Sequence, residues 1–242
     1  MTEPKDRIIV ALDYPELPPA VAMADLVGSR VGMVKVGLEL FNSAGPPAIS
    51  SLRERGARIF YDSKFYDIPT TVAGSAAAAA RMGVSMFNVH ALGGAKMMRA
   101  AREGAQRGAD QAGFSPPLVI AVTVVTSLGD REVRKELGIP ATAGEAAARL
   151  AFLARDAGLD GVVASVHEVS EIKRVCGTDF LVVTPGIRPT WAASGDQARF
   201  ATPRQALEAG SDYLVIGRPI TQAGDPGQAL AMILEEMSSP TA

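Results

Sequence analysis

Apolar and polar positions along the chain follow a repeating two-part pattern. Short runs rich in β-branched residues, typical of strands, alternate with longer Ala-rich stretches that are typical of helices. The expected strands cover residues 8–12, 33–36, 58–61, 86–89, 118–124, 161–164, 180–183 and 213–216. The expected helices cover residues 17–27, 47–55, 71–82, 95–106, 142–157, 169–175, 202–209 and 225–237. The pattern therefore predicts eight successive β/α units.

Glycines mark the ends of several expected helices. Gly56, Gly83, Gly108, Gly158 and Gly210 each follow a helical stretch and precede a strand, as in the αβ loops of a parallel sheet. The eight units fill the chain with no linker left over. This regularity favours a single α/β domain over residues 1–242, closed as a (β/α)8 TIM barrel, over a doubly wound open sheet.

Two segments interrupt the regular alternation. A short extra helix is expected at residues 131–137, in the loop after the fifth strand. Residues 194–199 lie in a long loop after the seventh strand. Long loops in compact domains are usually functional, so this loop is expected to serve the site.

The overall composition narrows the function classes. A formal net charge of −2 and a pI near 5.8 offer no basic field for nucleic acid or anionic lipid. The longest apolar runs fall far short of the roughly 20 residues of a membrane helix, and the charged N-terminus is unlike a signal peptide. The single cysteine, Cys176, fits a reducing compartment. We therefore expect a cytoplasmic protein without a nucleic-acid or membrane partner.

Charged residues gather where the first three expected strands end. Asp13 follows the first strand, Lys35 lies in the second, and Asp62 and Lys64 follow the third, with Asp67 beyond them. Barrel enzymes place their chemistry at the C-terminal ends of strands. Because side chains alternate along a strand, Asp62 and Lys64 are expected to share a face. The sequence predicts alternating carboxylates and ammonium groups at one mouth of the barrel.

This charge cluster has several interpretations. A ring of salt bridges could close a purely structural barrel, but uncharged side chains would close it without the cost of burying charge. Asp13, Asp62 and Asp67 could hold Mg²⁺, although the interleaved lysines already neutralise these carboxylates. Zinc is disfavoured because the two histidines, His90 and His167, lie far apart in the sequence. We favour a reaction centre without a metal.

The last two strands are followed by loops that suit an anion. The sequence TPGIR at 184–188 follows the seventh strand, and GRPIT at 217–221 follows the eighth. In barrel enzymes these two loops often bind phosphate. Gly217 allows a backbone N–H to approach an anion, and the Arg218 guanidinium can donate two hydrogen bonds to phosphate oxygens. The pair predicts a ligand that carries a phosphate group.

The segment DSKFYDIPTT at residues 62–71 resembles the D-x-K-x-x-D-I-P-x-T signature of the orotidine 5'-phosphate decarboxylase family. The likeness extends over nearly the whole chain. It takes in ALD at 11–13, VKVG at 34–37, VTVVTS at 122–127, TPGIR at 184–188, GDQ at 195–197 and VIGRPIT at 215–221. The D-x-K-x-x-D core also occurs in related sugar-phosphate barrels. Its combination with the PGIR loop, Gln197 and the Gly-Arg pair is specific.

The resemblance implies decarboxylation of orotidine 5'-phosphate to uridine 5'-phosphate, in pyrimidine biosynthesis and without a cofactor. It implies that Lys64 donates a proton to C6 of the pyrimidine and that Asp62 faces the departing carboxylate. Lys35 and Asp67 would complete the charged array. Family members are homodimers in which the second Asp of the signature reaches the neighbour's site, so Asp67 is expected to act in trans.

The resemblance also implies a set of substrate contacts at the strand ends and in the loops that follow them. The set is Asp13, Lys35, Asp62, Thr71, Thr126, Ser127, Pro185, Arg188, Gln197, Gly217 and Arg218. Asp13 and Lys35, with Thr71 beside them, would hold ribose hydroxyls. Thr126 and Ser127 would approach the base. Gln197, Gly217 and Arg218 would take the phosphate, and Arg188 would help to fasten a closing lid.

Three positions depart from the family pattern, and two rival functions share its features. Ser63, Tyr66 and Thr70 stand where Leu, His and Asn are more usual, and Tyr66 could alter a dimer contact near Asp67. One rival is a metal-dependent sugar-phosphate decarboxylase or aldolase on the same barrel, which would lose activity in EDTA. The other is a binding protein that takes a phosphate ligand without turnover.

Overall fold

Eight parallel strands close into a barrel in the computed structural model, which describes residues 3–192 and 200–238. Each strand pairs with the next along the chain, and β1 also pairs with β8. The strands are β1 Ile8–Ala11, β2 Met33–Val36, β3 Ile59–Phe65, β4 Met86–His90, β5 Leu118–Val122, β6 Gly161–Val163, β7 Leu181–Thr184 and β8 Tyr213–Ile216. The predicted TIM barrel is confirmed. The assignment of residues 1–242 to a single domain stays a prediction.

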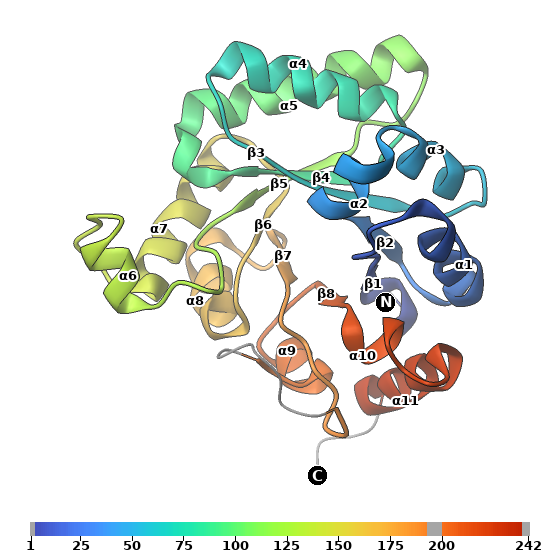
Figure 1. Ribbon diagram of the computed structural model, residues 1–242. Coiled ribbons are helices and arrows are strands. Elements are labelled where there is room, and N and C mark those ends of the chain that lie inside the picture. The colour runs from blue at the N-terminus through green and yellow to red at the C-terminus, as the bar shows by residue number, and fades with distance from the viewer. Residues whose placement is uncertain (1–2, 193–199, 239–242) are drawn as a thin grey trace.

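Helices surround the barrel (Figure 1). They are α1 Leu17–Val27, α2 Leu38–Ala44, α3 Pro47–Arg53, α4 Pro69–Arg81, α5 Gly94–Ala112, α6 Asp130–Lys135, α7 Ala143–Asp156, α8 Val166–Cys176, α9 Pro203–Glu208, α10 Arg218–Thr221 and α11 Pro226–Ser238. The described residues also form three short 3₁₀ helices, η1 Pro4–Arg7, η2 Gly28–Arg30 and η3 Ala91–Gly93. The expected extra helix after the fifth strand is α6. Within the described residues, no helix is long and apolar enough to cross a membrane.

The strands bury both of their faces, and successive residues serve two different cores. In β1, Ile8 and Val10 pack outward against the helices, whereas Ile9 points into the barrel. The inward positions of the other strands supply the rest of the barrel interior, including Met33, Phe60, Met86, Ile120, Val183 and Val215. This two-residue alternation fixes which side chains can reach the barrel mouth.

Helix α5 continues six residues beyond the expected end at residue 106, and Gly108, which the sequence pattern placed after the helix, lies inside it together with Gly104. A Cβ added to Gly104 would lie 2.2 Å from the carbonyl oxygen of Ala73, and one on Gly108 would lie 2.2 Å from that of Ala77. These glycines therefore let α5 pack directly on the backbone of α4. Figure 1 shows the two helices side by side along one side of the barrel.

Two partly buried carboxylates hold neighbouring strands together at the N-terminal end of the barrel. Asp160, just before β6, accepts hydrogen bonds from a backbone N–H of β5 and from Arg102. Asp212, just before β8, accepts from a backbone N–H of β7 at 2.7 Å and from Lys173 at 2.7 Å. Lys173 also donates to two backbone carbonyls, those of Thr178 and Phe180. At this end the charges are bound to the backbone of neighbouring strands.

Candidate active site

The inward-facing positions change from apolar to polar toward the C-terminal ends of β1–β4. Asp13 follows Ile9 and Ala11 on the inward face of the first strand, and Lys35 follows Met33 on the second. Asp62 follows Phe60 on the third, and Asn88 follows Met86 on the fourth. The apolar residues fill the barrel, and the polar ones that succeed them line its mouth.

Four charged groups at this mouth form a continuous chain of ion pairs. The Lys35 Nζ lies 2.8 Å from Asp13 Oδ1 and 3.4 Å from Asp62 Oδ2. The other oxygen of Asp62, Oδ1, accepts a hydrogen bond from Lys64 Nζ at 2.7 Å. The predicted grouping of Asp13, Lys35, Asp62 and Lys64 is therefore confirmed in space. Asp62 and Lys64 point to the same side of β3, as expected.

Burial and charge act in opposite directions on Asp62. Burial raises the pKa of this carboxyl, but the Lys35 and Lys64 ammonium groups and hydrogen bonds from Lys64 and Asn88 bring the pKa below its ordinary value. Asp62 is therefore ionised at neutral pH although its side chain is only 14% exposed. A fixed negative charge thus lies between two ammonium groups.

A glycine makes room for the Lys35 pair. A Cβ added at Gly37 would lie 3.0 Å from Lys35 Nζ and 3.3 Å from Asp13 Oδ1. Gly37 lies between β2 and α2, directly before this helix, which the sequence pattern did not predict. A larger side chain at this position would crowd the ion pair between Asp13 and Lys35.

Lys64 has an unusual backbone conformation that the sequence pattern did not reveal. Among the described residues it is the one non-glycine residue with a positive φ, 49°. The expected third strand ended at residue 61, whereas β3 continues to Phe65 with an irregularity between Tyr61 and Phe65. The backbone N–H of Lys64 donates to the side chain of Asn88 at 2.7 Å. Asn88 was not among the predicted site residues, although a lone amide within an apolar strand is a signal for a buried polar role.

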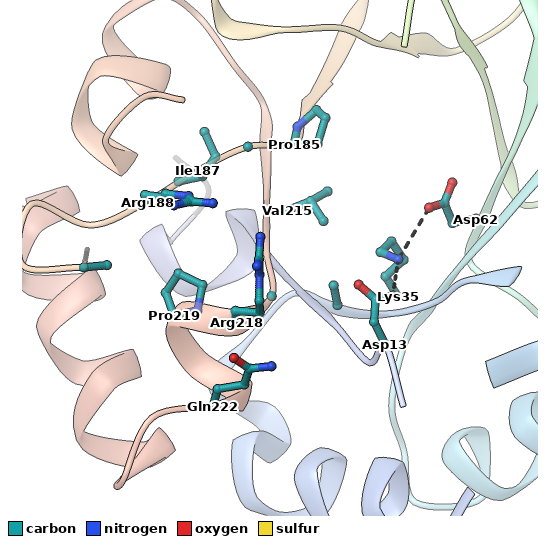
Figure 2. Close-up of a pocket in the computed structure, with 14 residues that line it drawn as sticks. Asp13, Lys35, Asp62, Pro185, Ile187, Arg188, Val215, Arg218, Pro219 and Gln222 are labelled. Atoms are coloured by element: carbon teal, nitrogen blue, oxygen red, sulfur yellow. Dashed lines mark hydrogen bonds and ion pairs between the residues drawn. The ribbon is translucent and has the colours of Figure 1, made fainter. Parts of the chain in front are cut away.

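A cavity of about 580 Å³ opens beside the ion pairs and extends toward the loops after β7 and β8. Figure 2 shows Asp13, Lys35 and Asp62 on one side of this cavity and Arg188 and Arg218 on the other. Two other predicted substrate contacts, Pro185 and Gly217, also line this cavity. The sequence analysis missed three further lining residues, Ile187, Pro219 and Gln222. The two arginines thus lie at the far end from Lys64.

A second cavity, of about 240 Å³, adjoins the first and is mostly apolar. Lys64, Thr126 and Ser127 line it together with the apolar residues Phe60, Val122, Val124, Val125, Val163 and Ala164. Both cavities are lined by Lys35, Asp62, Pro185 and Val215, so they meet at the centre of the charged array. The whole cleft has a cationic end, a central array of alternating charges and an apolar end.

Three predicted residues do not line this cleft or cannot be placed. Asp67 is exposed, and its carboxylate accepts a hydrogen bond from the backbone N–H of Ile68 at 2.6 Å. Thr71 is exposed on the first turn of α4. Neither residue lines either cavity of its own chain. Gln197 lies outside the described residues.

The carboxylates of this site are not arranged as a metal cluster. Within residues 3–192 and 200–238, no group of three or more His, Cys, Asp and Glu side chains could hold a metal ion. Asp13 and Asp62 are instead bridged by Lys35, and Asp67 lies apart from both. The arrangement suits an organic ligand that carries its own negative charges.

The sequence as a whole shows the family to which the chain belongs. Residues 6–233 match the model of the Orotidine 5'-phosphate decarboxylase / HUMPS family. The chain belongs to this family. The resemblance seen in the DSKFYDIPTT segment is therefore confirmed over nearly the full length.

Individual members of the orotidine 5'-phosphate decarboxylase family are similar in sequence and in structure. An orotidine 5'-phosphate decarboxylase of Nostoc sp. is 50% identical over 234 residues, which cover 97% of this chain and 98% of that protein. One of Moorella thermoacetica is 51% identical over 233 residues, covering 96% and 92%. The crystal structure of the orotidine 5'-phosphate decarboxylase of Lactobacillus acidophilus matches with a TM-score of 0.85 at 40% identity, covering 96% of this chain and 99% of that one.

Proposed function

We propose that this chain decarboxylates orotidine 5'-phosphate to uridine 5'-phosphate, the carboxy-lyase step of pyrimidine biosynthesis, with Lys64 as the proton donor. The relatives that are half identical over nearly the whole chain support the activity. The observation that carries the residue assignments is the chain of ion pairs from Asp13 to Lys64 at the centre of the cleft.

The two ends of the cleft suit the two ends of a nucleotide. The apolar cavity would take the pyrimidine ring, with Thr126 and Ser127 as its polar contacts. Arg218, the backbone at Gly217 and the predicted contact Gln197 would hold the phosphate at the other end. The Asp13–Lys35 pair lies between the two and would hold the ribose hydroxyls. In this pose C6 of the ring and its carboxylate lie beside Lys64 and Asp62.

The chemistry of the substrate explains why such a site needs ammonium groups. When CO₂ leaves C6 of the orotate ring, the electron pair of the broken C–C bond stays on C6 in the ring plane. The π-system of the ring cannot delocalise a pair in that plane. The Lys64 ammonium would stabilise the developing carbanion electrostatically and then transfer a proton to C6. Lys35 would keep Asp62 ionised beside the departing carboxylate.

Repulsion between Asp62 and the substrate carboxylate can supply only part of the acceleration. At ~4 Å and an effective dielectric constant of ~20, two like charges repel by at most ~4 kcal/mol. Enzymes typically lower the barrier by roughly 8–23 kcal/mol. The larger share must come from preorganised charge at C6 and from binding energy gained at the phosphate. Arg218 would therefore contribute to turnover although it lies at the other end of the cleft.

Loss of orotate absorbance tests the proposed function directly. Purified protein is mixed with orotidine 5'-phosphate, with and without EDTA, and the product is identified as uridine 5'-phosphate. We expect equal turnover in both conditions. Loss of turnover in EDTA would favour the metal-dependent alternative. Nucleotide binding without absorbance change would identify a binding protein and overturn the proposal.

We also propose that the protein is a homodimer in which Asp67 completes the site of the partner subunit. Asp67 and Thr71 lie outside the cleft of their own chain, on the segment that follows Lys64. The neighbouring apolar side chains of Tyr66 and Ile68 are 62% and 64% exposed. Exposed apolar side chains around a polar group are typical of a protein interface. Such a dimer would bring the fifth charge of the array to the site.

Subunit mixing tests the role of Asp67. Lys64→Ala and Asp67→Ala proteins should each be nearly inactive alone. After subunit exchange, about half of the dimers would be hybrids, each with one site that holds both residues. Activity should recover to about a quarter of the wild-type level. No recovery, despite exchange demonstrated by mass labelling, would place Asp67 outside the neighbour's site.

A further inference from the structure

The irregularity in β3 places three residues opposite a single residue of β4. Phe60 and Tyr61 of β3 pair with Met86 and Phe87 of β4, and pairing resumes at Phe65 opposite Val89. Residues 62–64 therefore face Asn88 alone. Such a bulge interrupts the ladder of backbone hydrogen bonds and re-aims the side chains that it carries. Both charged residues of β3 lie within it.

Asn88 contacts all three residues of this bulge. Its side-chain Oδ1 accepts a hydrogen bond from the backbone N–H of Lys64 at 2.7 Å, and its Nδ2 donates to Asp62 Oδ1 at 2.7 Å. Its backbone carbonyl accepts from the Ser63 hydroxyl at 2.9 Å. The side chain is fully buried. Because an N–H needs an acceptor and a carboxylate needs a donor, the amide has one satisfactory orientation.

We propose that Asn88 is a positioning residue for the decarboxylation, because its amide holds the Lys64 backbone and the Asp62 carboxylate in a fixed relation. This inference rests on the proposed function. A left-handed backbone is unfavourable for a lysine, and the hydrogen bond from Asn88 supports it. At Asp62, the Asn88 amide and the Lys64 ammonium share Oδ1, which leaves Oδ2 for Lys35. Asn88 thus determines how the carboxylate presents its two oxygens to the lysines.

Removing the amide should also change the titration of Asp62. Burial raises the pKa of Asp62, whereas Lys35, Lys64 and the hydrogen bond from Asn88 lower it. Loss of the Asn88 donor therefore raises the pKa of Asp62. Asp13, which pairs with Lys35, and His90 on β4 are further titratable groups of this site, and burial and Lys64 lower the pKa of His90. Since Asp62 must be ionised, the acid limb of the kcat profile should move to higher pH.

Three variants separate positioning from a general structural effect. Asn88→Ala removes both side-chain contacts, and Asn88→Asp keeps the shape and the acceptor but loses the donor to Asp62. Ser63→Ala is the matched control, because it removes a buried hydrogen bond of the same bulge that touches neither charged group. For each folded variant, kcat and KM for orotidine 5'-phosphate are measured as functions of pH.

We expect Asn88→Ala to lower kcat about 10- to 100-fold, since a misplaced catalytic group costs that much, with KM changed far less. Asn88→Asp should be at least as impaired, because it places a second carboxylate beside Asp62. In both variants the acid limb of the kcat–pH profile should move to higher pH. Ser63→Ala should stay close to wild type. Near-wild-type kcat in either folded Asn88 variant, or a loss equal to that of Ser63→Ala with an unmoved pH profile, would overturn the proposal. Failure of the proposed function would appear separately, as absent turnover in the wild-type protein.

Discussion

The two ends of the barrel both contain carboxylates beside cations, but the carboxylates have different partners at each end. At the N-terminal end, Asp160 and Asp212 each bind a backbone N–H of a neighbouring strand as well as a cation. At the C-terminal mouth, Lys35 and Lys64 bind carboxylates, and the array faces a cleft. The same residue types thus hold strands together at one end and line a ligand-sized cleft at the other.

The difference shows how to separate structural charge from reactive charge in a barrel. A carboxylate that satisfies backbone groups replaces hydrogen bonds to water and stabilises the fold. A carboxylate whose partners are other charged side chains costs desolvation energy and returns less stability. Such an arrangement is expected where function requires it. Substitutions at the two ends should therefore affect different measurements.

The largest expected effect is on turnover at the mouth. Lys64→Ala should lower kcat ~10²- to 10⁴-fold or more, because a positioned general acid contributes a rate factor of that size. Nucleotide binding should persist through the phosphate and ribose contacts. The comparison variant is Lys173→Ala at the opposite end, which should unfold more easily but keep its kcat when folded. A Lys64→Ala protein with more than about a tenth of wild-type kcat would contradict the role of Lys64.

A smaller effect is expected at the far end of the cleft. Arg218→Ala removes charge-assisted hydrogen bonds to the phosphate and should raise KM about 10- to 100-fold, with some loss of kcat. For this variant, kcat/KM should fall little further when the substrate lacks the phosphate. Steady-state kinetics with both substrates make the test. If removal of the phosphate from the substrate lowered kcat/KM by the same factor for wild type and variant, Arg218 would not bind the phosphate.

The smallest kinetic effect is expected at the N-terminal end, where the change should appear in stability. Asp212→Ala leaves a backbone N–H of β7 and the Lys173 ammonium without their shared acceptor, and should lower the free energy of unfolding by about 1–3 kcal/mol. Urea unfolding measures this, and kcat of the folded variant should stay within about twofold of wild type. A Glu171→Ala variant, which removes an exposed salt bridge on α8, is the control and should unfold like wild type. Lost turnover without lost stability would reverse the proposed division between the two ends.

Much of the molecule follows from local patterns in the sequence. The alternation of apolar runs predicts the eight strands, and the two-residue period places Asp62 and Lys64 on one face. The bulge at residues 62–64 does not follow from these patterns, because it depends on how β3 pairs with β4. Asn88 and the left-handed conformation of Lys64 were missed for that reason. The extent of α5 was missed because Gly108 packs on α4 rather than ending the helix.

The central claim is that turnover requires an ammonium group at position 64, and reconstructing that group tests it most directly. Lys64→Cys is made in a Cys176→Ala background, since Cys176 is the single natural cysteine. The thiol is then alkylated with 2-bromoethylamine to give a lysine-like side chain, or with iodoacetamide to give an uncharged one. We predict that kcat falls at least ~100-fold in the Cys form and recovers substantially with the aminoethyl group alone. Turnover by the unmodified Cys form above about a tenth of the parent, or equal turnover by the two adducts, would contradict the claim.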